Sequence, residues 1–280
     1  MQKARLIIEK DLKASHHMAS DEALLEYAIN NEKDFIPALR LYTWSPAGIS
    51  LGYFQKTEKE INIDNCRKHG VDIIRRPTGG KSVLHDDELT YCFIFKMDDP
   101  NRWTILDAFK KINEALLYAI KRMGVKAQLV SLKKHSPKEH TAVCFAVPSS
   151  YEIKVDNKKI IGSAQKRAGN FVLQHGSVPI TIDRNKLYDL FNFKSEEERK
   201  KQAEESVNIM TSLKEAAPFS DMNFDNLAEG VKEGFEKVWG ISLYKDKLNK
   251  EEEGIRDKLI EIKYGTDDWN YNKLIKNRSI

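Results

Sequence analysis

The 280-residue chain is long enough to bury a sizeable hydrophobic core in one or two domains without disulfide bonds. Hydrophobic residues make up 41% of the sequence and charged residues 31%, a composition that excludes a disordered chain. The net charge of +4 is smaller than nucleic-acid-binding proteins usually carry. It is compatible either with docking to an acidic protein or with an ordinary polar surface.

The sequence shows no membrane or secretion signal. No apolar run approaches the ~18 residues of a membrane helix, and the N-terminal segment becomes charged too early for a signal peptide. Cys66, Cys92 and Cys144 are odd in number and too widely spaced for a disulfide framework or a zinc site. We therefore expect a cytoplasmic protein without a membrane or nucleic-acid partner.

The first half of the chain combines helices with short strands. Periodic apolar residues and end signals predict helices over residues 18–28, 58–69 and 103–123. Ser20 is the expected N-cap of the first helix. Apolar segments predict strands over residues 39–44, 49–53, 71–75 and 89–95. We expect the first two of these strands to pair around Ser45 and Pro46.

A second block of strands follows a polar loop. Strands are predicted over residues 151–155, 159–161, 171–173 and 178–182, and the chain is mostly helical from Arg184 onward. Strands dominate the first two thirds without regular alternation with helices. The sequence therefore predicts an α+β fold with mixed, largely antiparallel sheets flanked by helices.

The segment Arg75-Arg-Pro-Thr-Gly-Gly-Lys-Ser82 resembles a phosphate-binding loop only at its end, because position 75 is not the glycine that a P-loop requires. Two adjacent glycines still allow a ligand to approach the backbone, and the basic neighbours suit an anionic or carbonyl-bearing ligand. A tight turn with solvated basic residues explains the same pattern. The following pair, His85 and Asp86, is more typical of a structural hydrogen bond, and no metal-ligand spacing surrounds it.

Two further segments contain candidate catalytic groups. Lys159 enters a predicted Gly-Ser-Ala turn over residues 162–164, where small residues leave room for a ligand and backbone amides could bind an oxyanion. A desolvated lysine there would be a usable base, whereas a surface strand with exposed lysines is the simpler alternative. Cys144 lies among apolar residues and is either inert core or a nucleophile with Lys159, His140 or His175 as its base.

Seven segments in one order resemble the lipoate/biotin protein ligase and octanoyltransferase superfamily. They are Ser20-Asp-Glu-Ala-Leu24, Ser50-Leu-Gly-Tyr-Phe-Gln55, Arg75-Arg-Pro-Thr-Gly-Gly80, Val83-Leu-His-Asp86, Glu88-Leu-Thr-Tyr91, Lys159-Ile-Ile-Gly-Ser-Ala-Gln165 and Leu173-Gln-His-Gly176. The resemblance spans residues 18–182, with a weaker similarity at residues 263–264 and 269–270. It implies a biotin/lipoate protein ligase-like catalytic fold over residues 1–245 and a helical C-terminal extension over residues 246–280, which could belong to the same domain.

Within this superfamily the chain is similar to the cysteine-dependent octanoyltransferases. Glu88-Leu-Thr-Tyr91 stands where ATP-using ligases tend to carry Gly-Asn-x-Asn, and ligases do not depend on a cysteine at the position of Cys144. The chain departs from the branch at Lys81-Ser82, at Cys92 and at His16-His17-Met18. These departures affect the acyl-chain preference and the pocket more than the reaction type.

The resemblance implies a reaction and assigns residues to it. Cys144 would form an acyl thioester and Lys159 would lower the pKa of its thiol. Octanoyl-acyl carrier protein would be the donor, and the lipoyl-domain lysine of a protein such as glycine cleavage H protein would be the acceptor, whose proton Lys159 or a nearby water would take. No cofactor and no metal would be needed. The implied substrate-binding residues are Arg76, Gly79, Gly80, Lys81, Val83, His85, Gly162, Ser163, Ala164 and His175.

Both protein partners of such enzymes are typically acidic. The basic residues around the motifs would therefore steer them, namely Arg75, Arg76, Lys81, Lys158, Lys166 and Arg167. The expected walls of an octanoyl slot are Val83, Leu84, Phe145 and Ile161. Three alternatives stay open: an ATP-dependent lipoate or octanoate ligase, an amidotransferase that moves octanoyl between lipoyl proteins, and a non-catalytic binding protein.

Overall fold

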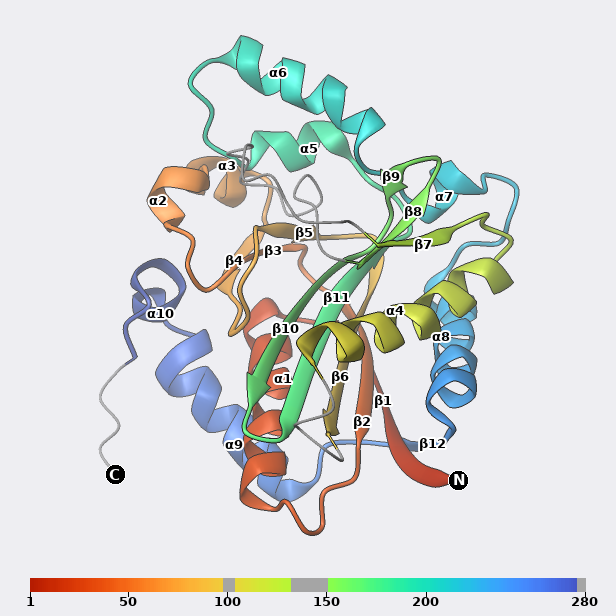
Figure 1. The fold of residues 1–280 in the computed structure, drawn as a ribbon. Helices are drawn as coiled ribbons and strands as arrows, with labels where there is room; N and C mark the ends of the chain where they lie inside the picture. Colours follow the sequence, from red (N-terminus) through yellow and green to blue (C-terminus); the bar gives the residue numbers. More distant parts are fainter. Residues whose placement is uncertain (98–103, 132–150, 276–280) are drawn as a thin grey trace.

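The computed structural model describes residues 1–97, 104–131 and 151–275, and a mixed six-stranded sheet forms its centre (Figure 1). The strand order is β10–β11–β6–β2–β1–β12. The strands are β1 (Gln2–Leu12), β2 (Ala38–Trp44), β6 (Glu88–Lys96), β10 (Gly162–Ala168), β11 (Phe171–Pro179) and β12 (Ile241–Asp246). The four strands from β10 to β2 are antiparallel, whereas β1 runs parallel to both β2 and β12.

Two small sheets lie beside the central one. The first has the order β4–β3–β5 and the second β7–β8–β9. Their strands are β3 (Gly48–Leu51), β4 (Asp72–Arg75), β5 (Val83–His85), β7 (Gln128–Ser131), β8 (Tyr151–Val155) and β9 (Lys158–Lys159). Antiparallel pairs outnumber parallel ones among the described strands, so the predicted α+β fold with mixed, largely antiparallel sheets is confirmed.

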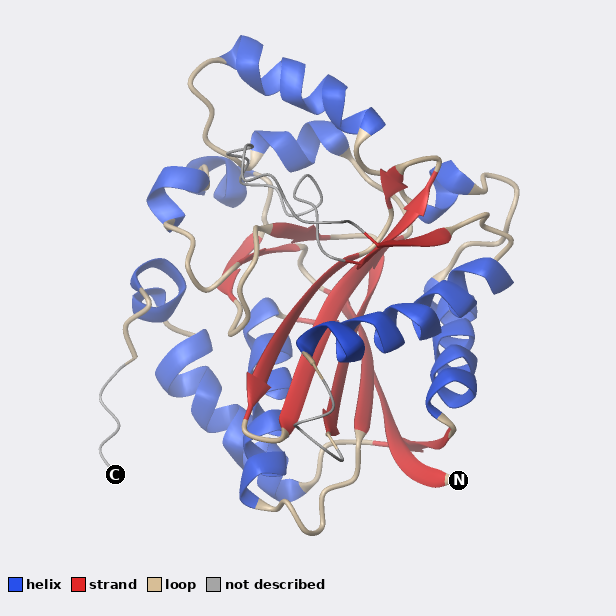
Figure 2. Ribbon diagram, viewed as in Figure 1, coloured by secondary structure: helices blue, strands red, loops and turns tan. Residues whose placement is uncertain are grey.

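Helices cover both faces of the central sheet (Figure 2). Helix α1 (Ala14–Asn30) lies on one face with α9 (Lys250–Leu259), and α4 (Ile105–Arg122) lies on the other with α8 (Phe224–Trp239). Alternation along β2 explains this arrangement: Leu39 and Leu41 belong to the core cluster under α4 and α8, whereas Ala38 and Tyr42 belong to the cluster under α1.

Short helices complete the molecule around the small sheets. They are α2 (Thr57–Glu60), α3 (Ile63–Lys68), α5 (Arg184–Asp189), α6 (Glu196–Glu205), the 3₁₀ turn η2 (Ser206–Asn208), α7 (Leu213–Ala216), the π-helical turn η3 (Ile260–Tyr264) and α10 (Asp267–Asn272). A third apolar cluster joins β3 to α5 through residues such as Ile49, Leu51 and Leu187. In the described ranges no helix is long and apolar enough to cross a membrane.

Several local expectations are wrong. Strands β2 and β3 belong to different sheets and do not pair with each other. Helix α1 begins at Ala14, so Ser20 lies inside it and caps nothing. The helix expected over residues 58–69 is interrupted by extended backbone at Ile61 and restarts behind Asn62, whose side chain accepts a hydrogen bond from the Asn65 backbone N–H.

The second block of strands also differs from its prediction. The two strands expected over residues 171–173 and 178–182 are one continuous strand, β11, which is paired with β6 along its whole length. The expected turn over residues 162–164 is the start of β10. Gly162 pairs with Ser177 there. Pairing with β11 gives hydrogen-bond partners to backbone N–H and C=O groups that a turn would leave unpaired.

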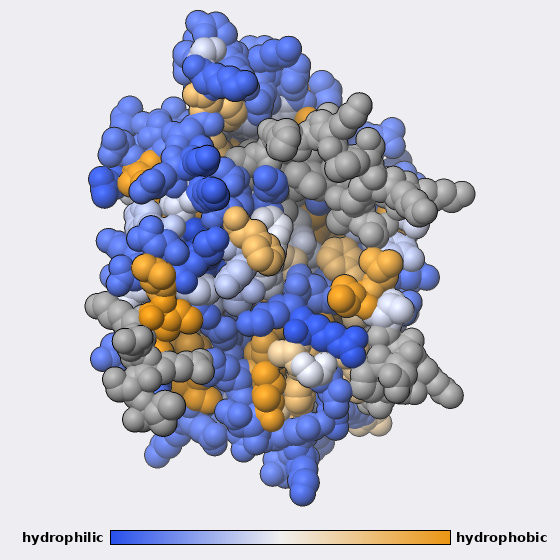
Figure 3. Space-filling model, turned by 60° about the vertical axis from the view of Figure 1, so that its left-hand side comes forward, coloured by the Kyte–Doolittle hydropathy of each residue, from blue (hydrophilic) through white to orange (hydrophobic). Residues whose placement is uncertain are grey.

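The C-terminal segment contacts the central sheet and α1. The Arg5 guanidinium on β1 binds both carboxylate oxygens of Glu252 on α9, at 2.5 and 2.8 Å. The Lys263 Nζ atom donates to Glu22 on α1 at 2.5 Å. The domain boundary at residue 245 stays a prediction. On the face of the molecule in Figure 3, hydrophilic residues dominate and apolar patches are separated by polar ones.

Candidate active site

Seven of the sequence-predicted binding residues line one pocket between the central sheet and the β4–β3–β5 sheet. The pocket spans about 330 Å³, part of it open to solvent. The predicted residues are Arg76, Val83, His85, Gly162, Ser163, Ala164 and His175, and six further residues complete the lining: Met18, Tyr42, Ser50, Thr90, Gly176 and Ser177. Segments far apart in the sequence therefore build one site.

His85 at the end of β5 lies in a chain of hydrogen bonds. Its Nδ1 atom is 2.7 Å from Glu88 Oε1, and its Nε2 atom is 2.8 Å from the hydroxyl of Ser50 on β3. The imidazole stacks on the Trp44 ring, with centroids 4.1 Å apart and planes 9° from parallel. A carboxylate at Nδ1 favours the tautomer that accepts the Ser50 proton at Nε2. We call Ser50, His85 and Glu88 the His85 relay.

His175 on β11 lies in a second chain of the same kind. Its Nδ1 atom is 3.0 Å from Asp21 on α1, and its Nε2 atom is 2.8 Å from the Thr78 hydroxyl. Asp21 also accepts from Arg40 at 2.8 Å and from the Tyr42 hydroxyl at 3.0 Å. We call Thr78, His175 and Asp21 the His175 relay.

The pKa values in the His175 relay follow from burial and charge. Burial lowers the pKa of His175 in spite of its hydrogen bond to Asp21. Burial alone would raise the pKa of the Asp21 carboxyl, but the hydrogen bond from His175 and the charge of Arg40 outweigh it and lower that pKa. The relay therefore combines a neutral imidazole with an ionised carboxylate.

Arg76 connects the two relays. Its guanidinium donates from Nε to the Thr78 hydroxyl at 3.1 Å and from Nη1 to the Ser50 hydroxyl at 3.2 Å. Its Nη2 atom donates to the carbonyls of Gly79 and Lys81, at 2.8 and 2.7 Å. Arg76 is only 4% exposed, so a buried positive charge lies between two hydroxyls of the pocket and fixes the glycine loop beside it.

The loop residues themselves stay at the edge of the site. Gly79, Gly80 and Lys81 are not among the residues that line the pocket. The backbone of Gly80 has a φ of +94°, a conformation that favours glycine. The Lys81 Nζ atom lies 3.9 Å from Glu60. Binding roles for these three residues remain predictions.

Strand β10 forms the opposite wall of the pocket. A Cβ atom at Gly176 on β11 would lie 2.5 Å from the Gly162 carbonyl oxygen and 2.8 Å from the Tyr91 ring, so this position requires glycine. The Tyr91 hydroxyl is 2.8 Å from Ser163 Oγ and accepts from Gln174 Nε2 at 2.8 Å. Burial raises the pKa of Tyr91, which keeps its hydroxyl protonated as a donor for this wall.

Of the predicted catalytic pair, Cys144 and Lys159, the structure describes only Lys159. Lys159 on β9 is 5% exposed, so the surface-strand alternative is wrong for it. Its Nζ atom forms an ion pair with Glu152 Oε1 at 3.1 Å, and its backbone is held by Ile209 and Thr211. Cys144, together with His140 and Phe145, lies outside the described residues. Lys159 is not in the pocket lining, but it precedes Gly162 by three residues.

Two expectations about charge and reactivity have clear outcomes. Arg75 is completely buried and donates to the carbonyls of Gln55 and Asn270 at 2.9 and 3.1 Å. The sequence suggested that Arg75 and Arg76 steer a partner from the surface, and their burial shows that this expectation is wrong.

Cys66 and Cys92 are packing residues as predicted, because both are buried and burial raises the pKa of each thiol.

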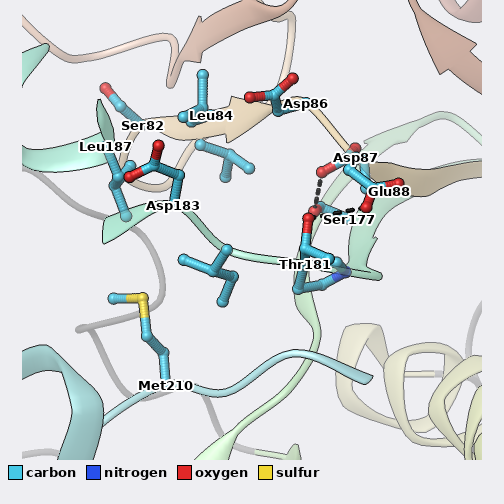
Figure 4. Close-up of a pocket in the computed structure, with 13 residues that line it drawn as sticks. Ser82, Leu84, Asp86, Asp87, Glu88, Ser177, Thr181, Asp183, Leu187 and Met210 are labelled. Atoms are coloured by element: carbon cyan, nitrogen blue, oxygen red, sulfur yellow. Dashed lines mark hydrogen bonds between the residues drawn. The ribbon is translucent and has the colours of Figure 1, made fainter. Parts of the chain in front are cut away.

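A second, larger pocket adjoins the first (Figure 4). It spans about 570 Å³, part of it open to solvent, and shares Val83 and Ser177 with the first pocket. Its lining combines apolar residues, which include Leu84, Ile182, Leu187 and Met210, with the carboxylates of Asp86, Asp87, Glu88 and Asp183. Of the expected walls of an octanoyl slot, Val83 lines both pockets and Leu84 lines the second. Ile161 instead belongs to the core under α4 and α8.

The sequence motifs contain Ser50, Thr78, Asp21 and Glu88, but sequence reasoning gives none of them a role. Their contacts join β3, β6, α1 and the glycine loop, and no local pattern indicates which hydroxyl meets which histidine. Asp86, which is adjacent to His85 in the chain, binds Lys186 at 2.7 Å instead. Within the described ranges, no three His, Cys, Asp or Glu residues are placed to hold a metal ion.

Comparisons with known proteins identify the family. Residues 13–236 match the lipoyl protein ligase A/B catalytic domain. Curated relatives named octanoyltransferase LipM include those of Carboxydothermus hydrogenoformans and Bacillus subtilis, each 37% identical over 96% of this chain and 98% of the relative. The LipM protein of Halalkalibacterium halodurans is 36% identical over 98% of this chain and 100% of its own.

Solved structures agree on the fold. A bipartite lipoate protein ligase of Thermoplasma acidophilum, described with its E2 lipoyl domain, superposes with a TM-score of 0.83 at 25% identity, covering 99% of this chain and 100% of the other. A lipoate-protein ligase A bound with ATP gives 0.78 at 24% identity, covering 98% and 100%. The predicted lipoate ligase-like fold is thus confirmed. The chain belongs to the lipoyl protein ligase A/B catalytic-domain family, is similar over nearly its whole length to the LipM octanoyltransferases, and is an acyltransferase.

Proposed function

We propose that this protein transfers an octanoyl group from octanoyl-acyl carrier protein to the lysine of a lipoyl domain, such as that of glycine cleavage H protein, in lipoate biosynthesis. The transfer proceeds through a thioester on Cys144. The observation that carries this proposal is the 34–38% identity, over 92–98% of the chain, to eight relatives curated as octanoyltransferase LipM.

In the first half-reaction, the Cys144 thiolate attacks the thioester carbonyl, a carbon–sulfur bond forms, and the carrier thiolate leaves. An unperturbed thiol has a pKa of about 8.5, so it needs a cation nearby to supply the nucleophile at neutral pH. Lys159 supports this role because it is a buried cation three residues from the pocket wall at Gly162. The apolar residues of the second pocket, Leu84, Ile182, Leu187 and Met210, suit the hydrocarbon tail, and Val83 lines both pockets.

An ATP-dependent lipoate ligase is the second candidate, favoured by the fold shared with lipoate protein ligases. A ligase activates a free acid as an adenylate, whereas the proposed transferase needs no nucleotide. Dependence on ATP therefore separates the two candidates directly.

The test is intact mass spectrometry after incubation with octanoyl-acyl carrier protein without ATP. We expect a gain of one octanoyl group that hydroxylamine removes. The adduct is expected to be absent in Cys144→Ser, to persist in the matched Cys66→Ser variant, and to form more slowly in Lys159→Ala. Peptide mapping assigns the modified cysteine.

Three results would contradict the proposal. Acylation of a lipoyl domain only from free octanoate and ATP would identify a ligase. Loading only from an octanoylated lipoyl protein would identify an amidotransferase. Binding of carrier or lipoyl domain without turnover under all three conditions would identify a binding protein.

A further inference from the structure

We propose that the His85 relay serves the second half-reaction: through the Ser50 hydroxyl, His85 takes the proton of the acceptor lysine as that lysine attacks the acyl thioester. This inference rests on the proposed function and deepens it. It gives His85 the proton that family resemblance alone would give to Lys159.

The geometry of the relay is that of an activated hydroxyl. Ser50 Oγ, His85 and Glu88 are joined by contacts of 2.8 and 2.7 Å, and Ser50 and His85 both line the pocket. Arg76 donates to the Ser50 oxygen, which leaves the hydroxyl hydrogen to point at His85 Nε2. The stacked Trp44 ring holds the imidazole in this orientation. A base, its orienting carboxylate and a hydroxyl are thus joined by hydrogen bonds, with the base and the hydroxyl at the pocket wall.

Glu88 explains why this histidine, rather than the other one, suits a base. Among the described residues, Glu88 accepts hydrogen bonds from His85 and from the neutral hydroxyls of Thr90 and Ser177, with no lysine or arginine paired to it. A proton on His85 would therefore form a buried ion pair with a carboxylate that otherwise has no cationic partner. Such a carboxylate stabilises the imidazolium that forms during proton transfer.

The His175 relay lacks this property. Its carboxylate, Asp21, is already paired with Arg40 at 2.8 Å, and burial lowers the pKa of His175. A positive charge on His175 would have to share the Asp21 carboxylate with the Arg40 guanidinium. His175 therefore suits a structural, neutral role in the same pocket.

Three charged or titratable groups lie close to the His85 relay. Glu88 on β6 hydrogen-bonds His85 Nδ1, Arg76, directly after β4, donates to the Ser50 hydroxyl that His85 contacts, and His175 on β11 lines the same pocket. The neighbouring Asp86 pairs with Lys186 instead.

The chemical step balances within the enzyme. The neutral acceptor amine attacks the octanoyl carbonyl, the carbon–nitrogen bond forms and the carbon–sulfur bond to Cys144 breaks. The extra proton on nitrogen passes to Ser50 Oγ while the Ser50 proton passes to His85 Nε2. Cys144 leaves as its thiolate, and the imidazolium later releases its proton to solvent.

The test separates loading from transfer. Octanoylated enzyme is isolated, mixed with a lipoyl domain in a single turnover, and followed from pH 5.5 to 9. For His85→Gln we expect loading within about twofold of wild type but transfer slowed about 100-fold, the usual size of a general-base contribution. The acid limb of the pH profile should disappear. Glu88→Gln should slow transfer in the same way, and Glu88→Asp should restore part of the rate.

One control variant and one replacement variant help to interpret the result. His69→Gln changes a histidine that pairs with Asp189 and lines neither pocket, and it should leave both half-reactions unchanged. Circular dichroism and melting temperature verify that each variant folds. For a variant that does not fold, Ser50→Ala replaces it, with the same expected loss in transfer alone.

The outcomes distinguish the two proposals. If wild-type enzyme forms no octanoyl–Cys144 adduct, the proposed function fails before the relay is tested. If the adduct forms and His85→Gln transfers at the wild-type rate, or loading and transfer fall together, the relay is wrong. Loss of the acid limb in Lys159→Ala but not in His85→Gln would return the base role to Lys159.

Discussion

The two histidine relays of the pocket have the same parts and different electrostatics. Each joins a hydroxyl, an imidazole and a carboxylate, and Arg76 donates to both hydroxyls. The carboxylate of the His175 relay, Asp21, is compensated by the Arg40 guanidinium, whereas Glu88 in the His85 relay meets neutral hydroxyls. A buried carboxylate with its own cation mainly holds structure in place, and one without a cation can stabilise a transient positive charge.

Removal of the Asp21 charge is expected to give the largest effect on stability. Asp21→Asn leaves the buried Arg40 with one counter-charge fewer and should lower the free energy of unfolding by about 3 kcal/mol. Glu88→Gln disturbs neutral hydrogen bonds and should cost on the order of 1 kcal/mol. Chemical denaturation of both variants measures the difference. Equal losses would show that the two carboxylates do not differ in the way described.

The backbone beside the two relays offers a second contrast. Gly176 follows His175 where β10 and β11 approach closely, and Gly176→Ala would place Cβ 2.5 Å from the Gly162 carbonyl oxygen. We expect it to lower stability by about 2 kcal/mol, in the range of overpacking. Gly79, in the loop beside Arg76, serves as the matched control, because a Cβ atom there would meet no other atom within 4 Å. Gly79→Ala should change the melting temperature little, and a comparable loss in both would contradict the close approach.

The sequence predicted the elements of the fold far better than the contacts inside the site. Period and end signals located α1, α4, β6 and β8, because these depend on neighbours in the chain. The separation of β2 from β3 into two sheets depends on pairing with distant strands, which no local pattern reveals.

The site shows the same limit. Glycine and basic motifs indicated Arg76, His85 and His175 as pocket residues, since such motifs suit a ligand near the backbone. Asp21 and Ser50 were missed because they meet His175 and His85 only through tertiary folding. Glu88 lies only three residues after His85, but the sequence did not show that its carboxylate contacts the imidazole. The charge of Arg75 also gave a wrong prediction. It suggested a basic surface residue, but the Arg75 guanidinium is buried and donates to backbone carbonyls.

The network behind Asp21 predicts a loss of stability at mildly acidic pH. Burial, and then the charge of Arg40, lower the pKa of His17 to about 2, so His17 stays neutral in the folded protein. The unfolded chain, with a histidine pKa near 6.5, binds the extra proton, and stability therefore falls as the pH drops below about 6.5. Between pH 7 and 5.5 this histidine should cost about 1 kcal/mol, before carboxylates begin to titrate. Denaturation at both pH values, with His17→Gln as the comparison, checks the sign, and an unchanged pH dependence in that variant would refute it.

The smallest expected effect concerns charges outside the pocket. Arg75 and Arg76 are buried, so of the six basic residues around the motifs only Lys81, Lys158, Lys166 and Arg167 are accessible enough to attract acidic partners. We expect Arg167→Glu to slow association with the carrier protein several-fold at low salt, and the difference from wild type to vanish near ~0.3 M salt, where exposed charges are screened. Arg67→Glu, an exposed position on α3, is the matched control and should have little effect. If association is indifferent to salt, the basic surface plays no part in docking, and the pocket charges act on chemistry and stability alone.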